Sequence, residues 1–335
     1  MNDSKSILSP SMPKPALQRP GTGTLLRAAG MIALALAPLV AGDPFTIHLA
    51  ILVCINAIVV SGLTILSRAG QVSLCHGAFV GIGAYVAVFT GMGANLPFPV
   101  AVVAAMMAGG VCAFLLGAIM LRLSGVYFVL VTFAFGELVR LGLLEWDTVT
   151  GGANGIAGIP AATLLGYSLE DKPAFYAVVA LVTVGVTALL AILLRSPAGQ
   201  AVDTVGENPA LAESSGVSVR GTQLFAFTAS GVLAGLGGAL TAYYLGYISP
   251  ESFSLHLSTA VIIMMVVGGR KALLGPLVGA LVMTPLPELF RGAVQTQTIF
   301  YGVALILMLR FLPQGLASLP ISLASTLGRS RRNAP

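Results

Sequence analysis

Charged residues are scarce in this chain. Lys, Arg, Asp and Glu together make up 9% of its 335 residues, whereas about 25% is usual for a soluble domain. A soluble protein of this length needs a polar surface that this composition does not supply. Apolar residues make up 56% of the chain and come in blocks of about 20 residues, the length that spans a hydrocarbon core. Because the backbone in lipid must satisfy its own hydrogen bonds, these blocks predict transmembrane helices.

Several chemical signatures are also missing. The three cysteines, Cys54, Cys75 and Cys112, lie in apolar stretches without the spacing of a zinc site or a disulfide framework. No Gly-x-x-x-x-Gly-Lys-Ser/Thr sequence occurs, so the chain has no Walker loop to hold ATP. No Ser/His/Asp or paired-carboxylate constellation appears, and His76 stands alone. From these absences we expect a chain that is not an enzyme and that holds no resident cofactor or metal.

The apolar blocks predict an all-α, polytopic transmembrane helical bundle with about ten spans, some of them short or broken by Gly and Pro. The alternating hydropathy of a membrane β-barrel is missing. The predicted spans are 25–42, 45–67, 71–92, 98–121, 125–144, 174–194, 223–246, 252–268, 273–290 and 296–312.

The distribution of Lys and Arg predicts which side each loop faces. With the N-terminus inside and each span reversing the side, 14 of these residues fall on the inside and only Lys172 and Arg291 fall outside, with Arg140 inside a span. Cytoplasmic loops carry the excess of Lys and Arg, so both termini are predicted to be cytoplasmic. The same bias explains the net charge of +5 without a nucleic-acid partner.

This topology divides the chain into three parts. Residues 1–24 are polar and predict a disordered cytoplasmic tail. Residues 25–315 form the transmembrane domain, and residues 316–335 form a basic cytoplasmic tail.

The longest polar segment predicted on the inner face is 195–222. Asn208 is a good N-cap, Pro209 suits the first helical position and Gly216 suits the C-terminal stop, so a short helix is expected between them. A rigid element between two spans is suited to docking a partner that supplies mechanical work. Its candidate coupling residues are Asp203, Glu207, Asn208, Ala212, Glu213 and Gly216.

Two further features inside the predicted spans have both a structural and a functional interpretation. The first feature is a set of closely spaced glycines, which either permit tight helix packing or mark a discontinuous helix beside a pathway. These glycines are Gly77, Gly81, Gly83, Gly235 and Gly237. Glu137 and Arg140, at i and i+3, can pair on one helical face, either as a structural ion pair or as part of a pathway or partner contact.

Several motifs together resemble the LivM-type permeases of branched-chain amino-acid ABC transporters. They begin with Gly70-Gln71-Val72-Ser73-Leu74-Cys75-His76-Gly77-Ala78-Phe79 and Gly125-Val126-Tyr127-Phe128. They continue with Gly151-Gly152-Ala153-Asn154-Gly155, Arg195-Ser196-Pro197-Ala198-Gly199, Ser249-Pro250 and Gly268-Gly269. The resemblance covers about residues 45–315, and the motifs occur in the family's order.

The resemblance implies a type II ABC importer permease fold in a bacterial inner membrane. Its implied partners are a second, LivH-like permease subunit, two ATP-binding subunits and a periplasmic substrate-binding protein, all around the lipid bilayer. The chain departs from the family at Cys75, at the pair Arg270 and Lys271, and in the cytoplasmic loop, where Gln200, Asp203 and Gly206 stand in place of basic residues.

Alternatives remain at this stage. The same machinery could carry urea, amides or aromatic acids. A secondary transporter driven by an ion gradient needs coupling carboxylates near the membrane centre, and the spans offer only Glu137. A polytopic membrane enzyme lacks a catalytic cluster.

Overall fold

The computed structural model describes residues 42–164, 166–286, 302 and 316–318. Seven helical segments in this part are long and apolar enough to cross a membrane. They are α2 (Pro44–Arg68), α3 (His76–Val88) with the π-helical turn η1 (Phe89–Gly93), α4 (Phe98–Met120), α5 (Val126–Glu145), α7 (Lys172–Arg195), α10 (Val219–Leu245), and the 3₁₀ turn η3 (Pro250–Phe253) with α11 (Leu255–Gly268).

The remaining elements are short. Between the spans lie α6 (Asp147–Thr150), η2 (Gly152–Asn154), α8 (Pro197–Glu207) and α9 (Pro209–Ser214), followed later by α12 (Gly275–Met283) and η5 (Leu316–Ser318). Two antiparallel pairs of two-residue strands occur, β1 (Ile156–Ala157) with β4 (Tyr247–Ile248) and β2 (Thr163–Leu164) with β3 (Tyr167–Ser168).

The all-α membrane fold is confirmed, but the count of ten spans is not. Seven of the predicted spans correspond to the seven segments above, most within a few residues. The predicted spans 25–42 and 296–312 lie outside the described residues, apart from residues 42 and 302. The predicted span 273–290 is described only to residue 286, and its helix α12 has nine residues.

The third span begins later than its hydropathy suggests. Helix α3 starts at His76 instead of residue 71, because Gly70 has a positive φ of 83° and the next residues stay irregular. There the Ser73 hydroxyl accepts a hydrogen bond from the Cys75 backbone N–H at 3.2 Å. Such local side-chain bonds compete with helix formation.

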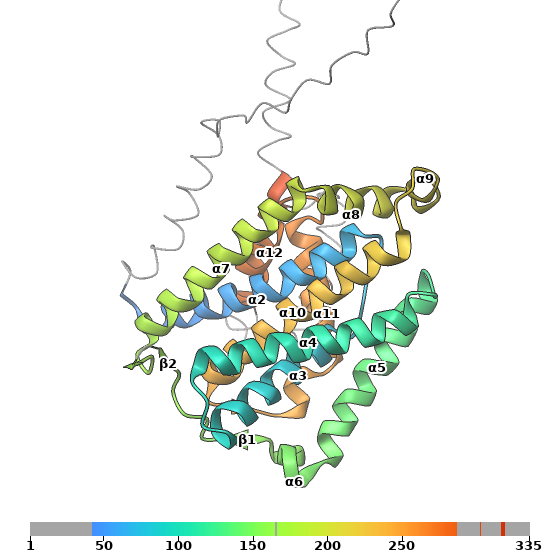
Figure 1. Cartoon of the computed structure of the whole chain (residues 1–335). Coiled ribbons are helices and arrows are strands. Elements are labelled where there is room, and N and C mark those ends of the chain that lie inside the picture. Colours follow the sequence, from blue (N-terminus) through green and yellow to red (C-terminus); the bar gives the residue numbers. More distant parts are fainter. Residues whose placement is uncertain (1–41, 165, 287–301, 303–315, 319–335) are drawn as a thin grey trace, which may run out of the picture. The chain divides into compact units, whose positions relative to one another are not determined.

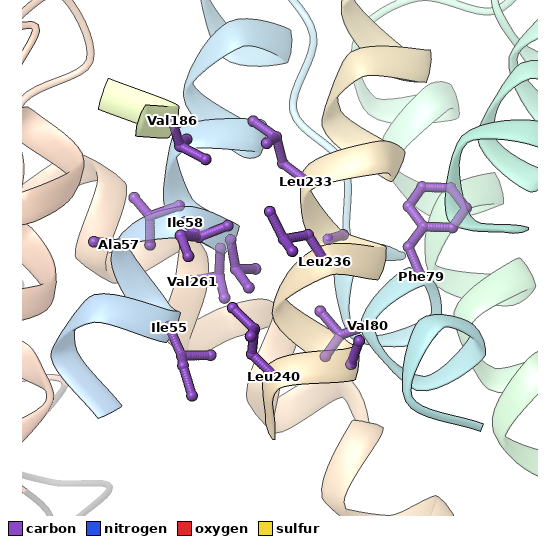
Figure 2. Close-up of a cluster of buried hydrophobic side chains, with 14 of the residues drawn as sticks. Ile55, Ala57, Ile58, Phe79, Val80, Val186, Leu233, Leu236, Leu240 and Val261 are labelled. Carbon is purple, nitrogen blue, oxygen red and sulfur yellow. The ribbon is translucent and has the colours of Figure 1, made fainter. Parts of the chain in front are cut away.

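Helix α10 packs against α2, α3 and α4. Small residues allow these contacts, since a Cβ atom at Gly83 would overlap the backbone of Gly235, and one at Gly235 would overlap the carbonyl of Ala105. Buried aliphatic side chains fill the adjoining space, and Figure 2 shows Ile58, Leu240 and Val261 from three different helices in one cluster.

The two ends of α10 meet different loops. At its C-terminal end, β4 pairs with β1, with Ile156 opposite Ile248, and so attaches the 146–171 connection. At its N-terminal end lie α8 and α9, and α8 contacts the C-terminal end of α2. Since α10 has 27 residues, these ends lie about 40 Å apart, far enough to reach opposite faces of a membrane.

Helix α5 packs more loosely than its neighbours (Figure 1, green). Of its 20 residues only Phe128 and Thr132 are buried, and its contacts are with α3, η3 and α11 and the short elements that follow it. Large apolar side chains such as Tyr127 and Leu138 are exposed along it. In a membrane protein this surface faces lipid or a partner.

Candidate functional site

The polar connection between α7 and α10 folds into two consecutive capped helices. Ser196 caps α8, its hydroxyl accepting a hydrogen bond from the Gly199 N–H at 3.3 Å, and Pro197 occupies the first helical position. Helix α8 was not predicted from the sequence. Its signal was available, because Ser196-Pro197 repeats the cap-and-proline pattern of Asn208-Pro209.

The predicted short helix is confirmed as α9. The Asn208 side-chain oxygen accepts a hydrogen bond from the Leu211 N–H at 3.1 Å. The helix ends at Ser214, and Gly216 follows with a φ of 84°. Both ends of the element are therefore fixed by local chemistry.

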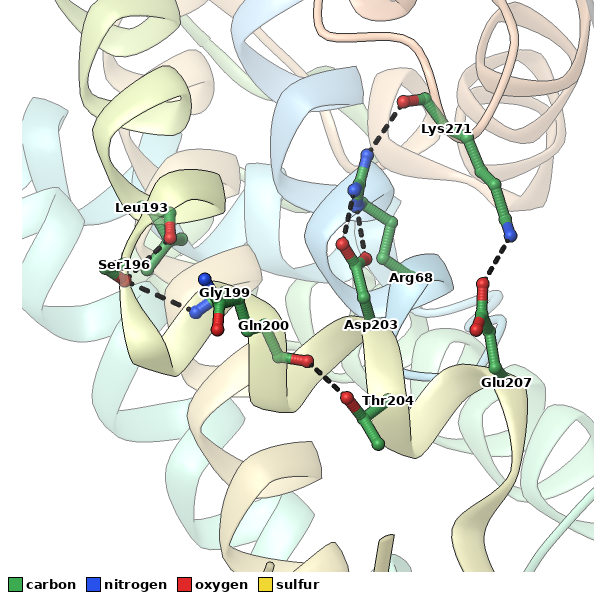
Figure 3. A network of polar contacts seen from close by, with 9 residues as sticks. All are labelled: Arg68, Leu193, Ser196, Gly199, Gln200, Asp203, Thr204, Glu207 and Lys271. Carbon is green, nitrogen blue, oxygen red and sulfur yellow. Dashed lines mark hydrogen bonds and ion pairs between the residues drawn. The ribbon is translucent and has the colours of Figure 1, made fainter. Parts of the chain in front are cut away.

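An ion-pair network, which we call the α8 clamp, fastens α8 to the end of α2 and to the turn between α11 and α12 (Figure 3). Arg68 donates from Nε to Asp203 Oδ1 at 2.7 Å and from Nη2 to Asp203 Oδ2 at 2.6 Å. Its Nη1 donates to the carbonyl of Lys271 at 2.9 Å. Lys271 Nζ in turn donates to Glu207 Oε1 at 2.7 Å.

The two ion pairs of the α8 clamp differ in exposure. The Arg68 side chain is 11% exposed and Asp203 38%, whereas Lys271 and Glu207 are 71% and 67% exposed. Exposed pairs contribute about 0–1 kcal/mol, so Arg68–Asp203 is the stronger joint. Asp203 and Lys271 thus belong to one network.

Glycine brings the backbones of α8 and α2 together. A Cβ atom at Gly206 would overlap the carbonyl of Arg68, and one at Gly70 would lie 3.3 Å from Gly206 Cα. The lack of a side chain at Gly206 allows this approach.

The candidate coupling residues of α9 differ in exposure. Ala212 is fully buried within this chain. Asn208, Glu213 and Leu211 are exposed instead, and Leu211 is 59% exposed. The helical period explains the difference, because neighbouring positions on a one-and-a-half-turn helix point about 100° apart.

Glu137 and Arg140 form the predicted pair on α5, with Arg140 Nε donating to Glu137 Oε2 at 2.9 Å. A third residue joins them, since Arg140 Nη1 donates to Glu251 Oε2 at 3.2 Å. Glu251 lies in η3, 111 residues further along the chain. Glu251 was not predicted as part of this pair, because no local pattern relates the two segments.

The five candidate glycines all lie at contacts between elements. A Cβ at Gly77 would lie 2.8 Å from the Phe253 carbonyl oxygen, and one at Gly81 would lie 3.0 Å from the Phe253 side chain. Gly83 and Gly235 touch each other, and Gly237 faces Val59. Their absent side chains are therefore used for close packing.

A family model described as branched-chain amino acid transport system / permease component matches residues 45–312. The chain belongs to this permease family. It is 33% identical to the high-affinity branched-chain amino acid transport system permease protein LivM of Escherichia coli, over 93% of this chain and 79% of that protein.

Other members of the permease family are similar over different lengths. LivM of Salmonella typhimurium is 33% identical over 81% of this chain and 69% of its own length. The autoinducer 2 import system permease protein LsrC of Enterobacter is 29% identical over 66% of this chain and 62% of its own length. No solved structure showed a significant match to this permease.

Proposed function

We propose that this chain is the transmembrane permease subunit of an ATP-binding-cassette importer for branched-chain or related amino acids. The family match over residues 45–312 carries this proposal. The two LivM relatives, whose names specify branched-chain amino acids, support the choice of cargo. As a transport component the chain is not an enzyme.

The proposed partners are a second, LivH-like permease subunit, two ATP-binding subunits and a periplasmic substrate-binding protein. A chain without a Walker loop must receive the work of ATP hydrolysis from another subunit. The large apolar side chains exposed on α4 and α5 provide surface for lipid and for the second permease subunit. The permease itself requires no cofactor.

The proposed location is the bacterial inner membrane, with many passes and both termini cytoplasmic. Arg195 ends α7 next to α8, and Arg68 and Lys271 join the α8 clamp. Arg220 Nη2 donates to the Ala118 carbonyl at 2.8 Å, so the adjoining ends of α4 and α10 lie together. These cations share the end of the bundle that holds α8, and the positive-inside rule assigns that end to the cytoplasm.

In this function α8 and α9 form the coupling element. The ATP-binding subunits dock on the exposed side of α9 around Leu211, Glu213 and Asn208. The α8 clamp then passes their displacement to α2 and to the turn between α11 and α12, instead of letting a slack loop absorb it. Alternating access follows if the docked subunits bind the two conformations with different affinity.

The test is reconstitution of this chain with its four partner subunits in proteoliposomes. Uptake of radiolabelled L-leucine should require ATP, the ATP-binding subunits and loaded binding protein together. Uptake that follows an ion gradient without ATP-binding subunits would overturn the proposal. Uptake of amides or urea in place of leucine would overturn only the cargo.

A further inference from the structure

Glu137 lies near the middle of the membrane-spanning helix α5, and a second charged residue, Arg140, lies closer to its C-terminal end. Glu137 is 11 residues from Val126 and eight from Glu145, or about 16 Å and 12 Å along the helix. Arg140 follows one turn later. Ionisable side chains at such depth are costly in lipid and normally face protein or water.

The network that holds these charges is incomplete within this chain. It contains two carboxylates and one guanidinium, an excess of one negative charge. Arg140 Nη2 donates to no group among the described residues, and Glu251 is 74% exposed. The network therefore leaves both N–H donors and carboxylate acceptors open.

A narrow crevice adjoins the network between α5 and the beginnings of α3 and α11. Glu137 lines it together with apolar side chains that include Leu74, Ala78, Phe133 and Leu255. The crevice is too small to hold a water molecule in this structure. Arg140, the partner of Glu137, also binds Glu251, and Arg140–Glu251 is the one ion pair that the described residues provide between α5 and another element.

We propose that Glu137, Arg140 and Glu251 form a transit site for the head group of an α-amino acid, which rests on the proposed function. The cargo's ammonium binds between the two carboxylates and offsets the excess negative charge. Its carboxylate accepts hydrogen bonds from the open N–H groups of Arg140, in the geometry that guanidinium groups favour. The aliphatic side chain enters the crevice when α5 moves away from η3.

A zwitterion fits this network better than a basic side chain from the second permease subunit. A Lys or Arg would satisfy the excess negative charge but would leave the donors of Arg140 open. The amino acid satisfies both. Because its ammonium competes with Arg140 for Glu251, arrival of cargo also loosens the ion pair that holds α5, so binding stays weak enough for release.

The first test uses the complete reconstituted transporter with Arg140→Gln and Glu251→Gln. Glu145→Gln, an exposed residue at the end of the same helix, is the matched control. The two site variants should lower L-leucine uptake per ATP hydrolysed about tenfold, equivalent to one charge-assisted contact, while loaded binding protein still stimulates ATP hydrolysis. Unchanged uptake per ATP in both would overturn the site. Absence of ATP-dependent uptake in the wild type would instead contradict the proposed function.

The second test measures water access directly and identifies the occupant. Ser252→Cys, at an exposed position next to Glu251, leaves the three site residues intact. In a background in which Cys54, Cys75 and Cys112 are replaced, it is labelled with a membrane-impermeant thiol reagent in the purified complex. Millimolar L-leucine should slow labelling severalfold, whereas 4-methylpentanoate, which has the same carbon skeleton without the ammonium, should not. Equal labelling with and without leucine, or a cysteine covered permanently by the second permease subunit, would overturn the proposal.

Discussion

Arg68 and Asp203 are joined by two hydrogen bonds of 2.7 Å and 2.6 Å across 135 residues of sequence. This bidentate pair connects the last residue of α2 to the middle of α8. Since the fork geometry fixes orientation as well as distance, α8 cannot rotate freely about the end of α2. The coupling element is thereby joined to a membrane helix by side chains as well as by the backbone.

Removing the charge of Asp203 should loosen this joint. Asp203→Asn should weaken it by about 1.5–3 kcal/mol, the range for hydrogen bonds to charged groups. The expected result is that loaded binding protein still stimulates ATP hydrolysis, while L-leucine uptake per ATP falls severalfold. Glu207→Gln is the control, because its pair with Lys271 is exposed, and it should stay within twofold of the wild type. Equal effects of both variants would contradict the assignment of Arg68–Asp203 as the main joint.

The backbone contact between Gly206 and Arg68 should be as important for coupling as the Arg68–Asp203 ion pair. The Cβ of Gly206→Ala would overlap the Arg68 carbonyl, so α8 must shift, at a cost of about 1–3 kcal/mol. We expect a lower melting temperature of the purified complex together with reduced coupling. Gly185→Ala, whose Cβ would meet open space, should leave both unchanged. A neutral Gly206→Ala would mean that α8 does not lie against α2.

Assembly of the helical bundle should depend on the close packing of α10. Gly235→Ala places a Cβ against the Ala105 carbonyl and should reduce the abundance of the subunit in membranes and its thermal stability. Gly142→Ala on α5, with nothing within 4 Å, is the matched control. If Gly235→Ala has normal abundance but transports poorly, the small residues serve the pathway more than the packing.

Much of this fold could be predicted from hydropathy and charge, because lipid imposes both length and helicity on a span. The same rules failed at the start of α3, where the positive φ of Gly70 and the Ser73 hydroxyl favour an irregular backbone before His76. Local capping chemistry predicted α9 well, and the same reading of Ser196-Pro197 would have found α8.

The candidate site was less accessible to sequence reasoning. Asp203 and Glu207 were predicted as coupling residues, and their partners within this chain, 135 and 64 residues away, have no local pattern that could have predicted them. Glu251 was missed for the same reason. The inward orientation of Ala212 depends on how α9 rests on its neighbours, which a single short helix does not encode.

The side of the membrane that each loop faces can be checked with single cysteines in place of Lys172 and Arg270, both exposed in the structure. In a background without native thiols, a membrane-impermeant reagent added outside spheroplasts should label position 172. It should label position 270 only after the membrane is permeabilised. Labelling of both from the same side would contradict the arrangement of α7, α10 and α11.

The exposed side of α9 should be where the ATP-binding subunits act. Leu211→Asp places a charge on an apolar contact, and Gly216→Pro removes the positive φ of 84°, which proline cannot adopt. Both should leave the subunit inserted and abundant but uncoupled, whereas Leu211→Met should behave as the wild type. Ala212→Arg should instead destabilise α9, because that position is buried.

Coupling through α9 is tested most directly by the stimulation of ATP hydrolysis by loaded binding protein, recorded with L-leucine uptake in the same proteoliposomes. Wild-type and Leu211→Met subunits should show strong stimulation and uptake. Leu211→Asp should lose both, at equal subunit abundance. Normal stimulation and uptake in Leu211→Asp and Gly216→Pro would show that α8 and α9 do not couple this permease to ATP, and uptake without any ATP-binding subunit would contradict the importer itself.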